Sequence, residues 1–65
     1  MKVGDLVLCP VDNYQSGSFW WSGKPGIVVG FESGSGHHPV IARVNVNGQG
    51  LATFGLMFLE VLSET

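Results

Sequence analysis

The strongest constraint on the fold is a stretch in which the side chains alternate in character and which ends at an Asn-Gly pair. In an extended strand over 40–46, one face would carry Val40, Ala42, Val44 and Val46, and the other Ile41, Arg43 and Asn45. Asn47-Gly48 follows at once, and this pair is typical of a tight hairpin turn because both of its positions need positive φ. We therefore predict a hairpin in which 40–46 pairs with 51–54 and Val44 points inward.

Three further extended runs accompany this hairpin. Leu6–Pro10 follows Gly4-Asp5 and ends at a proline, which suits the end of a strand. Residues 26–32 are rich in β-branched side chains, and their internal Gly30 predicts a bend or bulge. Residues 59–62 form a last short strand, and 55–58 have room for one helical turn before it. The Gly/Ser-rich segment 33–39 is predicted to be a flexible connection.

Five short strands in 65 residues, with a long loop after the first, fit a small closed barrel. Closure removes exposed sheet edges and lets a short chain surround one core. We predict one all-β domain over residues 1–62 and a frayed tail over 63–65. The single cysteine, Cys9, excludes an internal disulfide, so we expect it to be a buried free thiol and the core to be small.

Charge is scarce in this chain. Three basic and five acidic residues give a formal net charge of -2, whereas about a quarter of the residues of a soluble domain are usually charged. Together with apolar residues on both faces of 6–9, 27–29 and 56–59, this predicts that part of the apolar surface is covered. The cover is either the aromatic loop folding over the barrel of a monomer or a second chain. No leader-like or membrane-spanning apolar run is visible, so we expect a soluble, cytoplasmic protein and no membrane partner.

The candidate contact surface is a loop segment, 14–23, that holds four of the seven aromatic residues of the chain. Aromatic side chains spaced by Gly and Ser rather than by a strand period more often line a contact surface or brace a loop than fill a strand. We predict that protein-binding residues are Tyr14, Phe19, Trp20, Trp21 and Phe54. Of the adjacent tryptophans, one ring is expected to turn inward and the other outward.

The order of these landmarks resembles a known group of proteins. Residues 1–7, 26–31 and 58–63 look like those of the short SH3-like barrel proteins of tailed bacteriophages, especially phages of marine cyanobacteria. The resemblance implies an all-β, five-stranded SH3-like barrel in a viral context, located in the host cell cytoplasm, and it carries no catalytic residue.

A second similarity is to the small stromal barrel subunit of photosystem I. That subunit is more basic and lacks the tandem Trp20-Trp21, and barrel geometry common to both accounts for most of the match. The comparable positions are Gly4, Val7, Tyr14, Trp20, Gly26, Val28, Pro39, Val40, Arg43, Val44, Phe54, Leu59 and Val61.

Catalytic and cofactor chemistry is not favoured by the sequence. The five acidic residues are isolated, so they predict solvated or capping groups rather than a catalytic pair. His37-His38 has no cysteine or carboxylate at ligand spacing, and Gly34-Ser35-Gly36 is not followed by the lysine of a phosphate loop. We therefore expect no enzyme activity, no metal and no cofactor.

Three kinds of partner remain open. Exposed aromatic rings could stack on nucleic-acid bases, but only Lys2, Lys24 and Arg43 could neutralise phosphates, so this is the alternative rather than the favoured interpretation. A protein-binding groove of the SH3 type is weakened by the loop's single acidic residue, Asp12. We predict a protein-interaction module, a small phage accessory or assembly protein, that binds another protein or a second copy of itself.

Overall fold

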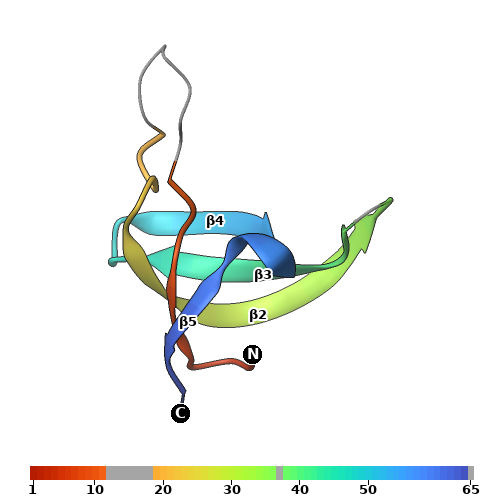
Figure 1. The fold of residues 1–65 in the computed structure, drawn as a ribbon, viewed down its shortest axis with the longest axis horizontal. Coiled ribbons are helices and arrows are strands. Elements are labelled where there is room, and N and C mark those ends of the chain that lie inside the picture. Colours follow the sequence, from red (N-terminus) through yellow and green to blue (C-terminus); the bar gives the residue numbers. More distant parts are fainter. Residues whose placement is uncertain (12–18, 37, 65) are drawn as a thin grey trace.

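The computed structural model describes residues 1–11, 19–36 and 38–64, which form a single antiparallel sheet of five strands in the order β4-β3-β2-β1-β5 (Figure 1). The all-β class, the five strands and the one helical turn before the last strand are confirmed. The elements are β1 (Leu6–Leu8), β2 (Pro25–Ser35), β3 (His38–Val46), β4 (Gly50–Gly55), the 3-10 turn η1 (Leu56–Phe58) and β5 (Glu60–Ser63).

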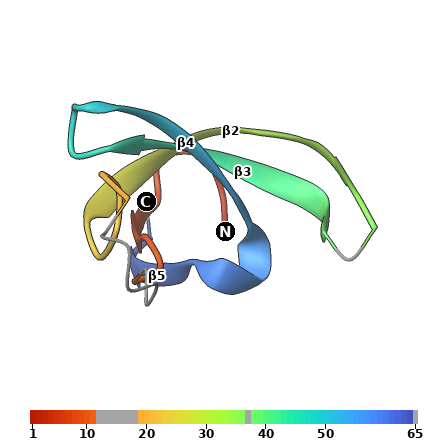
Figure 2. The same cartoon turned by 90° about the horizontal axis from the view of Figure 1, so that it is seen from above.

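The sheet curls strongly. Figure 2 shows β5 and η1 lying opposite β3 and β4, and the long β2, which pairs with β3 and β1, bends from the side of β3 toward that of β5. In the described part of the chain β4 and β5 are the two ends of the strand order, and η1 connects them. The side chains inside the curl form the core.

The core is small and consists almost entirely of the inward faces of the strands. In β3, Ala42 and Val44 are fully buried while Arg43 is exposed, so the predicted inward face of this strand is confirmed. The buried hydrophobic residues are Val7, Cys9, Val28, Ala42, Val44, Val46 and Phe54, with Trp21, Ala52 and Leu59 packed against them.

The turn between β3 and β4 has the predicted geometry. Asn47 has a φ of 48° and Gly48 a φ of 72°, and the N–H of Gln49 donates to the carbonyl oxygen of Val46 at 2.8 Å. Both central residues have the positive φ that a type I′ turn requires. Gln49 is included in the connection, because Val46 pairs with Gly50 in the ladder.

The predicted irregularity at Gly30 is also present. The register of the β2–β3 ladder shifts between Val28 and Gly30, which leaves Val29 unpaired. The guanidinium of Arg43 lies across Gly30 so closely that a Cβ there would be 2.8 Å from its Nη2 atom. A residue other than glycine would displace this side chain.

The prediction of a flexible connection over 33–39 is wrong for the residues that the structure describes. Ser33 pairs with Val40 and Ser35 with His38, so the hairpin continues almost to its turn at Gly36. Gly and Ser are poor strand formers, but pairing with the opposite strand overrides this weak local preference. His37 lies outside the described residues.

Smaller differences concern the ends of the elements and one acidic residue. β1 ends at Leu8 rather than Pro10, and β5 continues to Ser63, one residue into the predicted tail, whose Thr65 lies outside the described residues. Asp5 is not solvated: its side chain is buried, and its Oδ2 accepts a hydrogen bond from the backbone N–H of Lys2 at 2.9 Å. The expectation of a solvated group is therefore wrong for Asp5, whose carboxylate closes a turn at the start of the chain.

Candidate binding surface

Two consecutive tight turns hold the aromatic residues 19–21 at the end of the first loop. The N–H of Ser22 donates to the carbonyl of Phe19 at 3.0 Å, and that of Lys24 donates to the carbonyl of Trp21 at 3.2 Å. Gly23, with a φ of 68°, donates to the carbonyl of Pro10 at 3.1 Å, which ties the turns to the chain leaving β1. The backbone beneath these rings is therefore fixed by hydrogen bonds.

The rings of Phe19, Trp21 and Phe54 form a continuous stack. Phe19 and Trp21 are nearly parallel, with centroids 5.0 Å apart and an interplanar angle of 14°. Trp21 meets the ring of Phe54 edge to face, at 5.0 Å and 83°. Such aromatic pairs contribute roughly 0.5–1.5 kcal/mol each beyond the area that they bury. Phe54 belongs to β4 and is buried, so the stack anchors the loop to the core.

Trp20 lies differently from its neighbour. Its side chain is 45% exposed, whereas Trp21 is half-buried against the core. The covered part of the Trp20 ring lies over Gly50 at the start of β4, where a Cβ would be 3.3 Å from its Cη2 atom. Glycine at position 50 thus allows a flat ring to rest on the backbone.

The predicted contact residues therefore fall into three groups. Phe19, 52% exposed, and Trp20 present ring surface, while Trp21 and Phe54 lie beneath Phe19. Tyr14 lies outside the described residues. The prediction that the two tryptophans face different ways is confirmed, but its reasoning from an extended strand is wrong, because residues 20–23 form turns.

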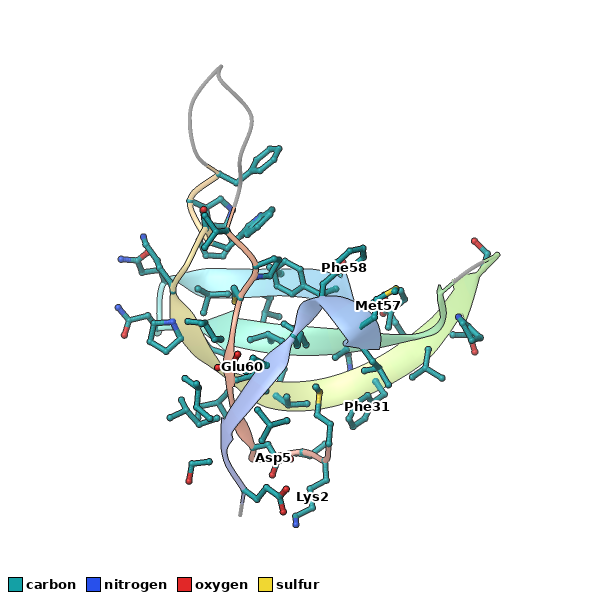
Figure 3. All side chains as sticks on the ribbon, in the orientation of Figure 1. Lys2, Asp5, Phe31, Met57, Phe58 and Glu60 are labelled. Carbon is teal, nitrogen blue, oxygen red and sulfur yellow. The ribbon has the colours of Figure 1, made fainter. Side chains whose placement is uncertain are left out.

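A second apolar region lies away from this surface, around the projecting part of the β2–β3 hairpin and η1. Figure 3 shows Phe31 on β2 and Met57 and Phe58 on η1. A shallow hollow of about 270 Å³ is lined by Phe31, Glu32, Ser33, Pro39 and Val40. The sequence predicted that the apolar residues 56–59 need cover, but it assigned no contact role to Phe31, which was counted only as part of the extended run 26–32.

The outer face of the sheet also carries apolar side chains. Leu6 pairs with Ile27 across β1 and β2, and Asn45 pairs with Leu51 across β3 and β4. Ile27 and Leu51 are exposed. The sequence predicted apolar residues on both faces for 27–29 but not for the segment that holds Leu51. A hollow of about 290 Å³ near the β3–β4 turn is lined by Leu6, Pro25, Gly26, Ile27, Asn45, Asn47 and Gly48.

The polar groups of the described residues are dispersed. No three His, Cys, Asp or Glu side chains among them gather in a group that could hold a metal ion. Cys9 is a buried free thiol, and burial raises its pKa above the ordinary value, which disfavours the nucleophilic thiolate. The ammonium group of Lys24 donates to Gln49 Oε1 at 3.0 Å, between the aromatic turns and the β3–β4 turn.

The comparisons with known proteins give no match: no family model fits the sequence, and no curated protein or solved structure is detectably similar. The resemblances to phage SH3-like barrels and to the photosystem I subunit therefore stay predictions. Over the described residues, no helix is long and apolar enough to cross a membrane.

Proposed function

We propose that this chain is a non-enzymatic protein-interaction module that binds a protein partner through Phe19 and Trp20. The observation that carries the proposal is that both rings are about half exposed although hydrogen-bonded turns fix the backbone beneath them. A large aromatic side chain on a rigid support loses little conformational freedom on binding, and Trp is enriched at the energetic centres of protein interfaces.

The supporting residues fit this role. The Phe19 ring rests on Trp21, which packs in turn on Phe54, so the exposed surface is linked to the core through a single stack. Trp20 is supported separately by the backbone at Gly50. The surface is therefore preorganised by two independent contacts with β4.

We include in the proposal that the architecture is an SH3-like barrel. Support comes from the strand order β4-β3-β2-β1-β5, from the long, bulged β2 and from the 3-10 turn between the last two strands. The resemblance to tailed-phage proteins is the support for a role as a small phage accessory or assembly protein. The neighbourhood of the gene, among tail, replication or host-takeover genes, tests that part.

Nucleic-acid binding remains the alternative, and the charges do not favour it. Lys2 lies near the N-terminus, Lys24 follows the aromatic turns and is hydrogen-bonded to Gln49, and Arg43 lies on the outer face of β3 across Gly30. Affinity for the phosphate backbone depends on several cations along one track. Any affinity for single-stranded DNA is expected to be weak and to disappear as the salt concentration rises.

The experiment that tests the proposal compares three immobilised proteins: wild type, Trp20→Ala and Met57→Ala. Met57 is 74% exposed and lies on η1, so its replacement removes a similar amount of apolar surface elsewhere (Figure 3). A protein retained by wild type and Met57→Ala but lost from a folded Trp20→Ala variant supports the proposal. Equal retention by all three, or tight binding of single-stranded DNA that survives high salt, contradicts it.

A further inference from the structure

The two edges of the sheet are protected to different degrees. β5 has four residues, begins with the charged Glu60, and pairs irregularly with β1, where the register shifts between Leu6 and Val7. Short strands, charges and bulges are the means by which natural sheets prevent pairing between edges. β4, at the other edge, has six residues from Gly50 to Gly55, none of them charged and none a proline.

The outer edge of β4 is accessible over Gly50 to Thr53, whereas Phe54 and Gly55 are buried. β4 pairs with β3 on one side, and among the described residues no strand pairs with its other side. Figure 2 looks toward this edge, and there β4 crosses in front of β3 and β2 with no other labelled strand in front of it. An edge strand presents a row of backbone N–H and C=O groups to any strand that approaches. Leu51, at 61% exposure, adds apolar surface beside that row.

We propose that the edge of β4 pairs in antiparallel fashion with β4 of a second copy of this chain. The two five-stranded sheets then become one continuous sheet across a twofold axis. This inference concerns an edge of the sheet. It does not depend on the exposed rings of Phe19 and Trp20, which are called the aromatic surface below.

A second copy fits this edge because the strand is self-complementary. Around a twofold axis each side chain faces itself or a symmetry-related neighbour, so a charged residue near the centre would face a like charge. β4 has no such residue, and it equally lacks a charge that would select an acidic or basic peptide. The scarcity of charge in the whole chain lowers the repulsion between two copies that each carry a net charge of -2.

The twofold axis must pass between two identical residues, because paired residues of an antiparallel ladder share one face of the sheet. We place it at Thr53, which is exposed on the outer face in the middle of β4. Two threonines then face each other, which is a favourable cross-strand pair. On the inner face, the small side chain of Ala52 lies opposite the large one of Phe54. Gly50, with the Trp20 ring over it, lies at the end of the paired β4 segments.

The first test is sedimentation equilibrium over a range of concentrations with wild type, Thr53→Lys and Asn45→Lys. Asn45 is exposed on the same outer face one strand inward, so its replacement adds the same charge away from the edge. Wild type and Asn45→Lys are expected to dimerise equally, and Thr53→Lys to dimerise at least about tenfold more weakly because two lysines meet on the axis. A wild type that stays monomeric at every concentration, or a Thr53→Lys variant that dimerises like it, overturns the proposal.

The second test fixes the register by oxidative cross-linking. Directly opposed residues have Cα atoms about 4.5–5.5 Å apart, within the range that a disulfide spans, so Thr53→Cys should form a covalent dimer. Asn45→Cys should not, since its Cα atoms would be three strand spacings apart across the sheet and four residues apart along it, about 20 Å in all. Buried Cys9 should give wild type no cross-link. A dimer without the Thr53→Cys cross-link overturns this interface.

The proposal for the aromatic surface and the proposal for the β4 edge can be tested separately. A Trp20→Ala variant should keep the dimer while losing the protein partner of the aromatic surface, and Thr53→Lys should keep that partner while losing the dimer. Loss of both by either single variant would mean that the surfaces are one interface, which contradicts the inference that the β4 edge acts independently.

Discussion

The two halves of the β2–β3 hairpin have the same kind of strand pairing but different burial. Near the β3–β4 turn, Val28 pairs with Val44 and both side chains are buried. Farther out, Ser33 pairs with Val40, on the same inward side of β3, yet Val40 is 42% exposed. Figure 1 shows why: the outer part of the hairpin extends beyond β4 and η1, so less of the molecule lies opposite it. Alternation determines which way a side chain points, and the layer opposite determines whether it is buried.

The sharpest test of this comparison replaces two valines on one face of one strand by aspartate. Val44→Asp buries a carboxylate among apolar side chains and should cost more than about 4 kcal/mol, enough to unfold a small domain. Val40→Asp places the same charge on exposed surface and should change stability by roughly 0.5 kcal/mol or less. Circular dichroism melts measure both. A cooperative melt of Val44→Asp near that of wild type would show that the inward face of β3 is assigned wrongly.

The comparison also separates what the sequence predicts from what it does not. The faces of β3, the turn at Asn47-Gly48 and the irregularity at Gly30 follow from local rules of side-chain period and backbone conformation, and all three are observed. The length of the hairpin does not follow from such rules. Ser33 and Ser35 are in a strand because His38 and Val40 pair with them, which is an interaction between segments rather than a local preference.

The aromatic surface was predictable in content but not in geometry. Four aromatic residues in a Gly/Ser-rich loop indicated a contact surface, and the different exposure of Trp20 and Trp21 was expected. The cause of this difference is a pair of hydrogen-bonded turns and an edge-to-face contact of Trp21 with Phe54. Position 54 comes more than thirty residues after Trp21, so no local pattern shows that their rings meet.

The two adjacent tryptophans allow the same comparison of a buried with an exposed position, here within one turn. Trp21→Ala removes a half-buried ring that touches both Phe19 and Phe54 and should cost about 3 kcal/mol. Trp20→Ala removes a ring that rests on Gly50 and should cost less, about 1 kcal/mol. Urea denaturation of the two variants gives both values. If both variants lost the same large amount of unfolding free energy and still bound the partner, the loop would have a purely structural role.

The turns at the two ends of β3 allow a finer comparison. Gly48 has a φ of 72° and Gly36 a φ of 60°, and a Cβ at either position would meet no atom within 4 Å. Valine at either position therefore introduces backbone strain alone, of roughly 1–3 kcal/mol. Gly48→Val should lower the free energy of unfolding by this full amount, because its turn closes the ladder of the core. Gly36→Val should lower it by less, since the projecting end can open without exposing the core.

Chemical denaturation of the Gly48→Val and Gly36→Val variants measures this difference. A Gly36→Val variant as unstable as Gly48→Val would mean that the projecting half folds as one unit with the core. Wild-type stability of Gly48→Val would instead show that the Asn47-Gly48 turn is not held at positive φ.

The smallest expected effect concerns the exclusion of water from the thiol of Cys9 in the core. Burial raises the pKa of its thiol in the folded protein, so the folded state holds this proton more tightly than the unfolded state does. The stabilisation is complete below the thiol pKa of the unfolded chain, about 8.5, and is lost as the pH rises through the higher pKa of the folded state. Wild type should therefore lose stability above about pH 8.5 more steeply than Cys9→Ala, which lacks the titrating group. The free energy of unfolding of both proteins, measured from pH 7 to 10, checks this, and parallel curves would show that water reaches Cys9 as freely in the folded protein as in the unfolded chain.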